Sequence, residues 1–277
     1  MSGEAYTNGN GVNGLAPLHS ISSVTISNEM FEKLYLNPAN KVKGELRRTF
    51  ANPTPLPLLG FLIASTPLAA ALMGWRGAGG GGAATIGTFY FFGGMLQIIG
   101  SILEWIIGNT FIYIVFGSFG AFWLAFAATL TPMYNAEAAF TAGATTAAEK
   151  AKGVASFQSS LAFFLLFMGL VVFMYLICSL RTNFVFFCIF LFLDIALFVL
   201  AGAYWKAAEG DVQAFHRLEI TSGAFVFVFC VFGWYLLFAQ LLETVDFPLD
   251  LPVGDLSGRI LTSRAKKPDI ESKHHTE

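Results

Sequence analysis

The stretch NFVFFCIFLFLDIALFVLAGAY, residues 183–204, carries one charged side chain, Asp194, in an otherwise apolar run. Its length suits an α-helix that crosses the hydrocarbon core of a bilayer, which needs about 20 apolar residues. Five further runs of this kind lie at 55–75, 84–107, 110–130, 155–180 and 218–242. They are continuously apolar, unlike the alternating strands of a membrane β-barrel. The sequence therefore predicts an all-α integral membrane protein with six transmembrane helices.

The composition of the whole chain agrees with a membrane location. Of its 277 residues, 55% are hydrophobic and only 12% are charged, whereas a soluble domain carries about 25% charged residues. The lipid bilayer is thus expected to be the solvent for much of the chain. The net charge of −2 indicates nothing about partners, but the absence of a basic patch with interleaved aromatic residues predicts no nucleic-acid partner.

The distribution of Lys and Arg predicts the domain layout and the orientation. Residues 1–50 form a polar N-terminal arm, 51–245 the six-helix transmembrane domain and 246–277 a C-terminal tail. If both termini are cytoplasmic, the inner segments hold eleven Lys and Arg and the outer loops five, as the positive-inside rule requires. Within the arm, residues 29–50 fit either a short interfacial segment or a solvated tail, and both interpretations stay open.

The second apolar run carries a polar stripe on one helix face. Tyr90, Gln97 and Glu104 are spaced by seven residues, and Gly94 and Ser101 lie between them at helical offsets. Placing a polar side chain at membrane depth is energetically unfavourable unless the side chain faces protein or water. The stripe therefore predicts either one wall of a polar pathway or a helix–helix seam built from small and hydrogen-bonding residues. Asp194 leaves a similar choice between a proton relay and a structural contact, and we favour the structural contact.

The first apolar run begins with an unusual segment, Asn52-Pro53-Thr54-Pro55-Leu56-Pro57. Proline favours a helix start but disfavours helical geometry in the residue before it. The segment is thus expected to be stiff and partly unwound. Its amide groups would be available to an anion, unless the segment is simply a helix cap at the membrane interface.

The sequence gives no sign of an enzyme or of a cofactor. All four histidines lie outside the apolar runs, and no catalytic triad or metal-binding motif is present. We therefore predict no catalytic residues, no metal site and no cofactor.

Several motifs, taken together, resemble the acetate uptake transporter family, also called the succinate–acetate permeases or YaaH-type proteins, in its fungal branch. The motifs are Asn52-Pro53-x-Pro55-Leu56, Phe89-Tyr90-Phe91-Phe92-Gly93-Gly94-x-x-Gln97, Glu104, Gly108-Asn109-Thr110-Phe111, Gly117-Ser118-Phe119-Gly120-x-Phe122-Trp123, Asp246-Phe247-Pro248 and Leu251-Pro252-Val253-Gly254. The resemblance spans roughly residues 50–256.

The resemblance implies a plasma-membrane transporter or channel for acetate and similar small monocarboxylates. Each protomer of a homohexamer would contain its own pore, narrowed by Phe61, Phe119 and Ile189. Tyr90, Gln97 and Glu104 would lie along the same path, and the motif around Asn52, Pro53, Pro55 and Leu56 would form its cytoplasmic mouth.

Five positions depart from the family pattern, namely Thr54, Pro57, Phe119, Ile189 and Gly233, where Ala, Gly, Tyr, Leu and Ala are usual. The choice among acetate, propionate and lactate therefore stays open.

A dry constriction favours a neutral passenger, because an unpaired carboxylate in an apolar medium faces a penalty of tens of kcal/mol. We therefore expect proton-linked transport, in which Glu104 holds the proton and Gln97 hydrogen-bonds the carboxyl group. An alternative function is a membrane acid sensor or scaffold that signals through its cytoplasmic arms. Ammonium movement has little support, because the apolar runs contain no histidines.

Overall fold

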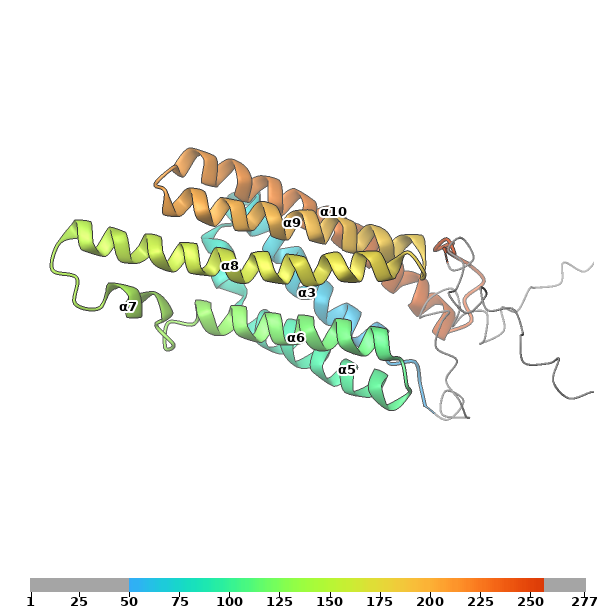
Figure 1. Ribbon diagram of the computed structural model, residues 1–277. Helices are drawn as coiled ribbons and strands as arrows, with labels where there is room; N and C mark the ends of the chain where they lie inside the picture. The colour runs from blue at the N-terminus through green and yellow to red at the C-terminus, as the bar shows by residue number, and fades with distance from the viewer. Residues whose placement is uncertain (1–49, 257–277) are drawn as a thin grey trace, which may run out of the picture.

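The computed structural model describes residues 50–256, which form a bundle of long α-helices (Figure 1). Six helical segments are long and apolar enough to cross a membrane, which confirms the predicted all-α architecture. They are α3 (Pro55–Leu72), a composite second span (Gly80–Ile106), α6 (Thr110–Leu130), α8 (Ala147–Ser179), α9 (Phe184–Ala208) and α10 (Val212–Thr244). The arm up to residue 49, with most of the possible interfacial segment, and the tail from residue 257 lie outside the described residues.

The second span changes helical geometry along its length. It consists of the 3-10 segment η3 (Gly80–Thr85), the short α4 (Ile86–Thr88), the π-helical η4 (Phe89–Leu96) and α5 (Gln97–Ile106). The segment before it contains the 3-10 turn η2 (Trp75–Gly77). Gly82 is buried within this region against Phe89 and Leu68, so the span begins earlier than hydropathy indicated.

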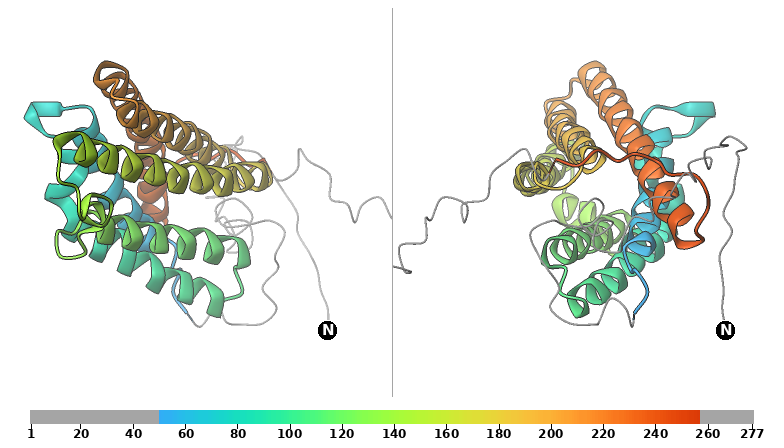
Figure 2. Two further views of the ribbon diagram at one scale, coloured as in Figure 1. Left: turned by 60° about the vertical axis from the view of Figure 1, so that its left-hand side comes forward. Right: turned by 90° about the vertical axis from the view of Figure 1, so that its right-hand side faces the viewer.

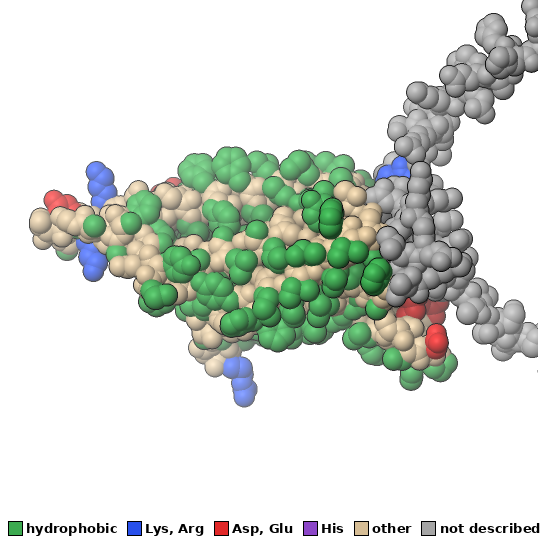
Figure 3. All heavy atoms as spheres, turned by 90° about the horizontal axis from the view of Figure 1, so that it is seen from below, with side chains coloured by type: hydrophobic (Ala, Val, Ile, Leu, Met, Phe, Trp, Pro, Cys, Tyr) green, Lys and Arg blue, Asp and Glu red, His purple; other side chains and the backbone are tan. Residues whose placement is uncertain are grey.

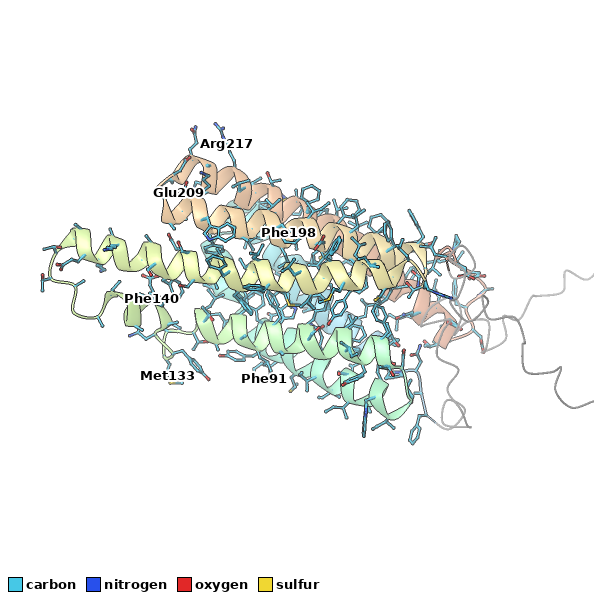
Figure 4. The ribbon with its side chains drawn as sticks, in the orientation of Figure 1. Phe91, Met133, Phe140, Phe198, Glu209 and Arg217 are labelled. Carbon is cyan, nitrogen blue, oxygen red and sulfur yellow. The ribbon has the colours of Figure 1, made fainter. Side chains whose placement is uncertain are left out.

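Both ends of the described chain lie at the same end of the bundle, here called the inner end (Figure 1). Charged side chains gather at the two ends of the face seen in Figure 3, and apolar side chains cover the band between them. This band is the surface expected for a protein surrounded by lipid. Phe91, labelled in Figure 4, is 61% exposed within it.

Helices α8 and α10 are longer than their apolar runs, at 33 residues each. A helix of that length measures about 50 Å and exceeds the hydrocarbon thickness of about 30 Å. The extra turns of α8 start at a capping box, in which the Thr146 hydroxyl accepts from the Glu149 amide. At the α9–α10 hairpin, Glu209 and Arg217 mark the opposite, outer end of the bundle (Figure 4).

Glycines allow the first three spans to pack closely. A Cβ on Gly60 of α3 would lie 2.4 Å from the Phe92 carbonyl oxygen, and one on Gly100 of α5 would lie 2.4 Å from Pro57. A Cβ on Gly93 would lie 2.6 Å from the Trp123 ring of α6. Small residues promote helix association in membranes because they let the backbones approach one another.

The segment after α10 returns across the inner end of the bundle to the start of α9 (Figure 2). The Phe184 amide donates to the Gly254 carbonyl over 2.7 Å, and the Tyr235 hydroxyl donates to the Pro252 carbonyl over 2.8 Å. Val253 is buried in the hydrophobic core. The motif Leu251-Pro252-Val253-Gly254 therefore pairs a free amide at the α9 N-terminus and ties α9 to α10.

Gly60→Ala should lower the thermal unfolding midpoint of the protein in detergent. The added methyl group would clash with a backbone oxygen, and overpacking of this kind costs about 1–3 kcal/mol. Gly87→Ala is the matched control, because nothing lies within 4 Å of its Cβ position. Equal midpoints for the two variants would contradict the close contact at Gly60.

Candidate functional site

Two of the three side chains predicted to form the constriction touch in the bundle interior. The ring centroids of Phe61 on α3 and Phe119 on α6 lie 5.3 Å apart, and both rings are buried. Ile189 on α9 belongs to the same buried core. It is not among the residues that line the neighbouring cavity described below.

The Phe229 ring of α10, which the sequence did not single out, joins this pair. It stacks on Phe61 with a centroid distance of 5.4 Å and an interplanar angle of 28°. Together, Phe61, Phe119 and Phe229 form an aromatic cluster from three helices. The signal in the sequence that could have identified Phe229 is Gly233. Phe229 lies four residues before Gly233 and therefore on the same face of α10.

A cavity of about 50 Å³ lies on the outer side of the aromatic cluster. Five helices line it, among others through Ser65, Trp123, Leu165, Leu197 and Val226. The Ser65 hydroxyl donates to the Phe61 carbonyl over 2.8 Å, and the Ser222 hydroxyl donates to the Ala196 carbonyl over 2.9 Å. With both serine hydroxyls committed to backbone, the wall is largely apolar. A dry apolar cavity of about 150 Å³ accommodates benzene, so this smaller one suits a molecule of a few heavy atoms.

Glu104 lies near the inner end of α5 and is fully buried. Its Oε1 accepts from the Thr54 hydroxyl, and its Oε2 accepts from Asn109 Nδ2 over 2.8 Å. The backbone N–H of Asn109 also donates to the backbone carbonyl of Glu104 over 2.9 Å. This buried polar cluster joins the starts of α3 and α6 to the end of α5. Thr54 takes part through its hydroxyl, at a position where the resemblance leads one to expect alanine.

The other members of the second-span stripe lie mostly in a helix–helix seam. The Ser101 hydroxyl donates to the Tyr113 carbonyl of α6 over 2.7 Å, and Gly94 packs on Leu124. Tyr90 shares a 3.1 Å hydrogen bond with Thr131 toward the outer end. Gln97 is fully buried and donates to the Gly93 carbonyl over 2.7 Å, whereas its Oε1 has no partner among the described residues. Gln97 thus retains an acceptor, while Gly94 and Ser101 serve packing.

The proline-rich mouth offers fewer backbone donors than the sequence suggested. The Thr54 amide donates to Asn52 Oδ1 over 3.1 Å, and the Leu56 amide donates to the Pro53 carbonyl over 3.2 Å. The Leu58 amide donates to the Thr54 carbonyl over 3.3 Å, and Pro55 has no amide hydrogen. Across residues 54–58 every amide donor is therefore used. These hydrogen bonds favour the interpretation of the segment as a helix start over anion binding by its backbone.

Asp194 is 7% exposed in the middle of α9, and its Oδ1 has no partner within residues 50–256. The structural contact that we favoured from the sequence is thus not visible as a hydrogen bond to this oxygen. The same part of the chain contains no group of His, Cys, Asp and Glu side chains that could hold a metal ion.

These features define a multi-pass membrane protein with six spans, an aromatic cluster in its interior and an apolar cavity beside that cluster. The chain belongs to the GPR1/FUN34/yaaH family, whose family model matches residues 35–258. The membership expected from the motifs is thereby confirmed.

Three known proteins show the range of the similarity. Protein alcS of Aspergillus fumigatus is 48% identical over 238 residues, which cover 85% of this chain and 86% of that protein. Acetate permease A of Emericella nidulans is 31% identical over 209 residues, covering 75% of this chain and 67% of that protein. The structure of the bacterial acetate channel SatP matches with a TM-score of 0.57 and 23% identity, covering 74% of this chain and 99% of that chain. At this identity the last match supports the fold alone.

Thr54→Val should lower the thermal unfolding midpoint, because it keeps the shape of the side chain but removes the hydroxyl that donates to Glu104. A buried group that loses a partner costs about 1–3 kcal/mol. Thr54→Ser retains the donor and should stay close to the wild-type midpoint. If the Val and Ser variants melt together, the hydrogen bond contributes nothing measurable.

Proposed function

We propose that this protein carries acetate and similar small monocarboxylates across the plasma membrane as a proton-linked transporter or channel. The observation that carries the proposal is the position of the aromatic cluster Phe61, Phe119 and Phe229. It lies between an apolar cavity on its outer side and the buried polar cluster of Glu104 on its inner side. The relative named acetate permease supports the substrate class, and it supports a transport protein over an enzyme.

The acidic side chains in the interior favour passage of the neutral acid. The charged side chains that the structure shows as buried are both acidic, Glu104 and Asp194, and they would repel a carboxylate. A short carboxylic acid has a pKa near that of a Glu side chain, so about one molecule in several hundred is neutral at pH 7. We propose that these neutral molecules cross the constriction, or that the anion crosses with a proton held at Glu104. Gln97 contributes a hydrogen bond on this path through its unpaired Oε1.

We propose that each protomer contains its own path, because five helices of one chain surround the cavity. We propose a homohexamer in the lipid bilayer with both termini cytoplasmic, in line with the distribution of Lys and Arg. Ile189 belongs to the proposed constriction one turn inward from the cavity-lining Leu193. The alternative of an acid sensor rests on the two arms, most of which lie outside the described residues, and no observation favours it.

Uptake of labelled acetate into liposomes that contain the purified protein should be saturable and should rise as the outside becomes acidic. Lowering the external pH from 7 to 6 increases the neutral fraction about tenfold, and the initial rate at low acetate concentration should increase by a similar factor. Empty liposomes correct for the permeability of the lipid itself. Folded protein that gives no flux above this background would refute the proposed function.

Glu104→Gln should reduce acid-stimulated uptake about tenfold, because the amide cannot hold the proton while its size is nearly unchanged. The initial rate across the same pH series measures this effect. If the Glu104→Gln variant is fully active and the uptake rate does not depend on the proton gradient, simple conduction of the anion is favoured instead.

Phe61→Ala should widen the constriction and admit larger acids. We expect the uptake of butyrate relative to acetate to rise about tenfold, since one or two methylene groups are worth that much in a tight apolar site. Phe91→Ala is the control, because Phe91 is an exposed ring on the lipid-facing surface. Unchanged selectivity in folded Phe61→Ala protein would remove Phe61 from the pore.

A further inference from the structure

The face of α10 that borders the cavity continues toward the inner end and reaches Gln240. Val226 and Phe229 line the cavity, and Gly233 and Gln240 follow on the same face at intervals of four and seven residues. Gly233 packs directly on Leu62 of α3, where a Cβ would lie 2.5 Å from Leu62 Cδ2. Gln240 is two turns further inward, about 10 Å along the helix. It therefore lies on the pathway face, on the inner side of the aromatic cluster.

Gln240 belongs to a layer of buried polar residues at the inner end of the bundle. Each member lies within about one turn of the inner end of its own helix, and each is fully buried. The other members are Thr54, Glu104, Asn109, Ser179 and Asn183. We call this set the inner polar layer.

Most side chains of the inner polar layer have partners within the protein, but Gln240 does not. Ser179 donates to the Leu176 carbonyl over 2.6 Å, and Asn183 Oδ1 accepts from the Phe186 amide over 2.8 Å. Both Gln240 Nε2 and Gln240 Oε1 are buried without a partner among residues 50–256, and so is Asn109 Oδ1. A buried amide with neither end paired is unfavourable, because it gives up its hydrogen bonds to water without replacing them. Gln240 has no exposed surface in one protomer, so neither a neighbouring protomer nor a small molecule reaches it unless the inner end of the bundle opens.

The unpaired amide matches one form of a carboxylic acid. A neutral carboxyl group has one O–H donor and one carbonyl acceptor. It can donate to Gln240 Oε1 and accept from Gln240 Nε2, forming a closed pair of hydrogen bonds. A carboxylate has no donor, so it would leave Oε1 unpaired and bring two negative oxygens toward it.

One charge in the inner polar layer acts in the same direction. Glu104 is the acidic member of the layer, and its charge disfavours a second carboxylate. The basic residue closest in sequence is Arg181, in the α8–α9 turn; its Nε is buried without a partner among the described residues, and its charge acts in the opposite direction. Asn109 Oδ1 adds one further acceptor and no donor, because its Nδ2 already donates to Glu104.

We infer that the Gln240 amide is a binding site for the undissociated form of a short carboxylic acid, on the inner side of the aromatic cluster. The inference rests on the proposed function for the identity of the passenger, and it adds the group that distinguishes the acid from its anion. Gln240 is thus a specificity-determining residue of the pathway.

Gln240→Met tests this site in liposomes that contain the full-length protein. The substitution keeps the length of the side chain and removes both hydrogen-bonding groups. The half-saturating concentration of labelled acetate, expressed as undissociated acid, should rise about 10- to 30-fold, as expected for the loss of two neutral hydrogen bonds. Leu236→Met is the matched control, because Leu236 is equally buried one turn earlier on α10 but apolar. A change of less than twofold in Gln240→Met, or an equal change in the control, would overturn the inference.

Competition by uncharged analogues distinguishes hydrogen bonding to Gln240 from an effect of the substitution on the packing of the protein. Acetamide offers a donor and an acceptor on the same carbon without any charge, whereas methyl acetate has no donor. Acetamide should inhibit wild-type acetate uptake more strongly than methyl acetate, and it should lose this advantage in Gln240→Met. Equal inhibition of the wild type by both compounds would overturn the inference even if the variant failed to fold.

Calorimetric binding of acetic acid and acetamide to the purified protein distinguishes this inference from the proposed function. Binding that depends on Gln240 without any transport would refute the function and keep the site. Transport without Gln240-dependent binding would refute the site and keep the function. Folded wild-type protein that neither binds nor transports would refute both.

Discussion

Helix α3 packs on the second span without any side chain between the two backbones at Gly60, and this contact positions the rest of the interior. The Gly60 Cα faces the Phe92 carbonyl oxygen, and Pro57 fills the space above Gly100. In lipid there is little hydrophobic force between helices, so close packing of this kind and interhelical hydrogen bonds hold the spans together. Because Phe61 directly follows Gly60, its ring is placed by the same contact. The Thr54 hydroxyl reaches Glu104 for the same reason, since the start of α3 lies against the end of α5.

The interior is graded from apolar to polar along the proposed path. The outer cavity and the aromatic cluster present carbon atoms, with the hydroxyls of Ser65 and Ser222 turned to backbone carbonyls. The inner side presents amide and carboxyl groups, some with unused hydrogen-bonding atoms. A molecule that must lose its water at the aromatic cluster meets most of the unused hydrogen-bonding atoms only after it has passed, although Trp123 Nε1 in the outer cavity wall also has no partner among the described residues. Such an arrangement discriminates on the penalty for dehydration, which is far larger for an anion than for a neutral acid.

The sequence predicted the parts of this structure that depend on composition and local pattern. Six apolar runs sufficed to predict six spans, because only helices of that length satisfy their backbone groups in lipid. The ends of α8 and α10 were missed, since a capping box and not hydropathy sets where α8 begins. The Thr54–Glu104 hydrogen bond joins residues 50 positions apart, and Phe229 is one of 30 phenylalanines in the chain. Contacts of that kind follow from the packing of helices, which a single sequence does not show.

The shape of the proposed constriction depends on α10 as well as on the rings that the family motifs identify. Gly233, where the resemblance leads one to expect alanine, leaves room for the Leu62 side chain against the α10 backbone. A methyl group there would lie 2.5 Å from Leu62 Cδ2, so the end of the Leu62 side chain would have to move. Leu62 is the sequence neighbour of Phe61, whose ring stacks on Phe229. A substitution at position 233 therefore acts on the proposed path through Leu62, so a residue that does not touch the proposed passenger can still influence which acid fits.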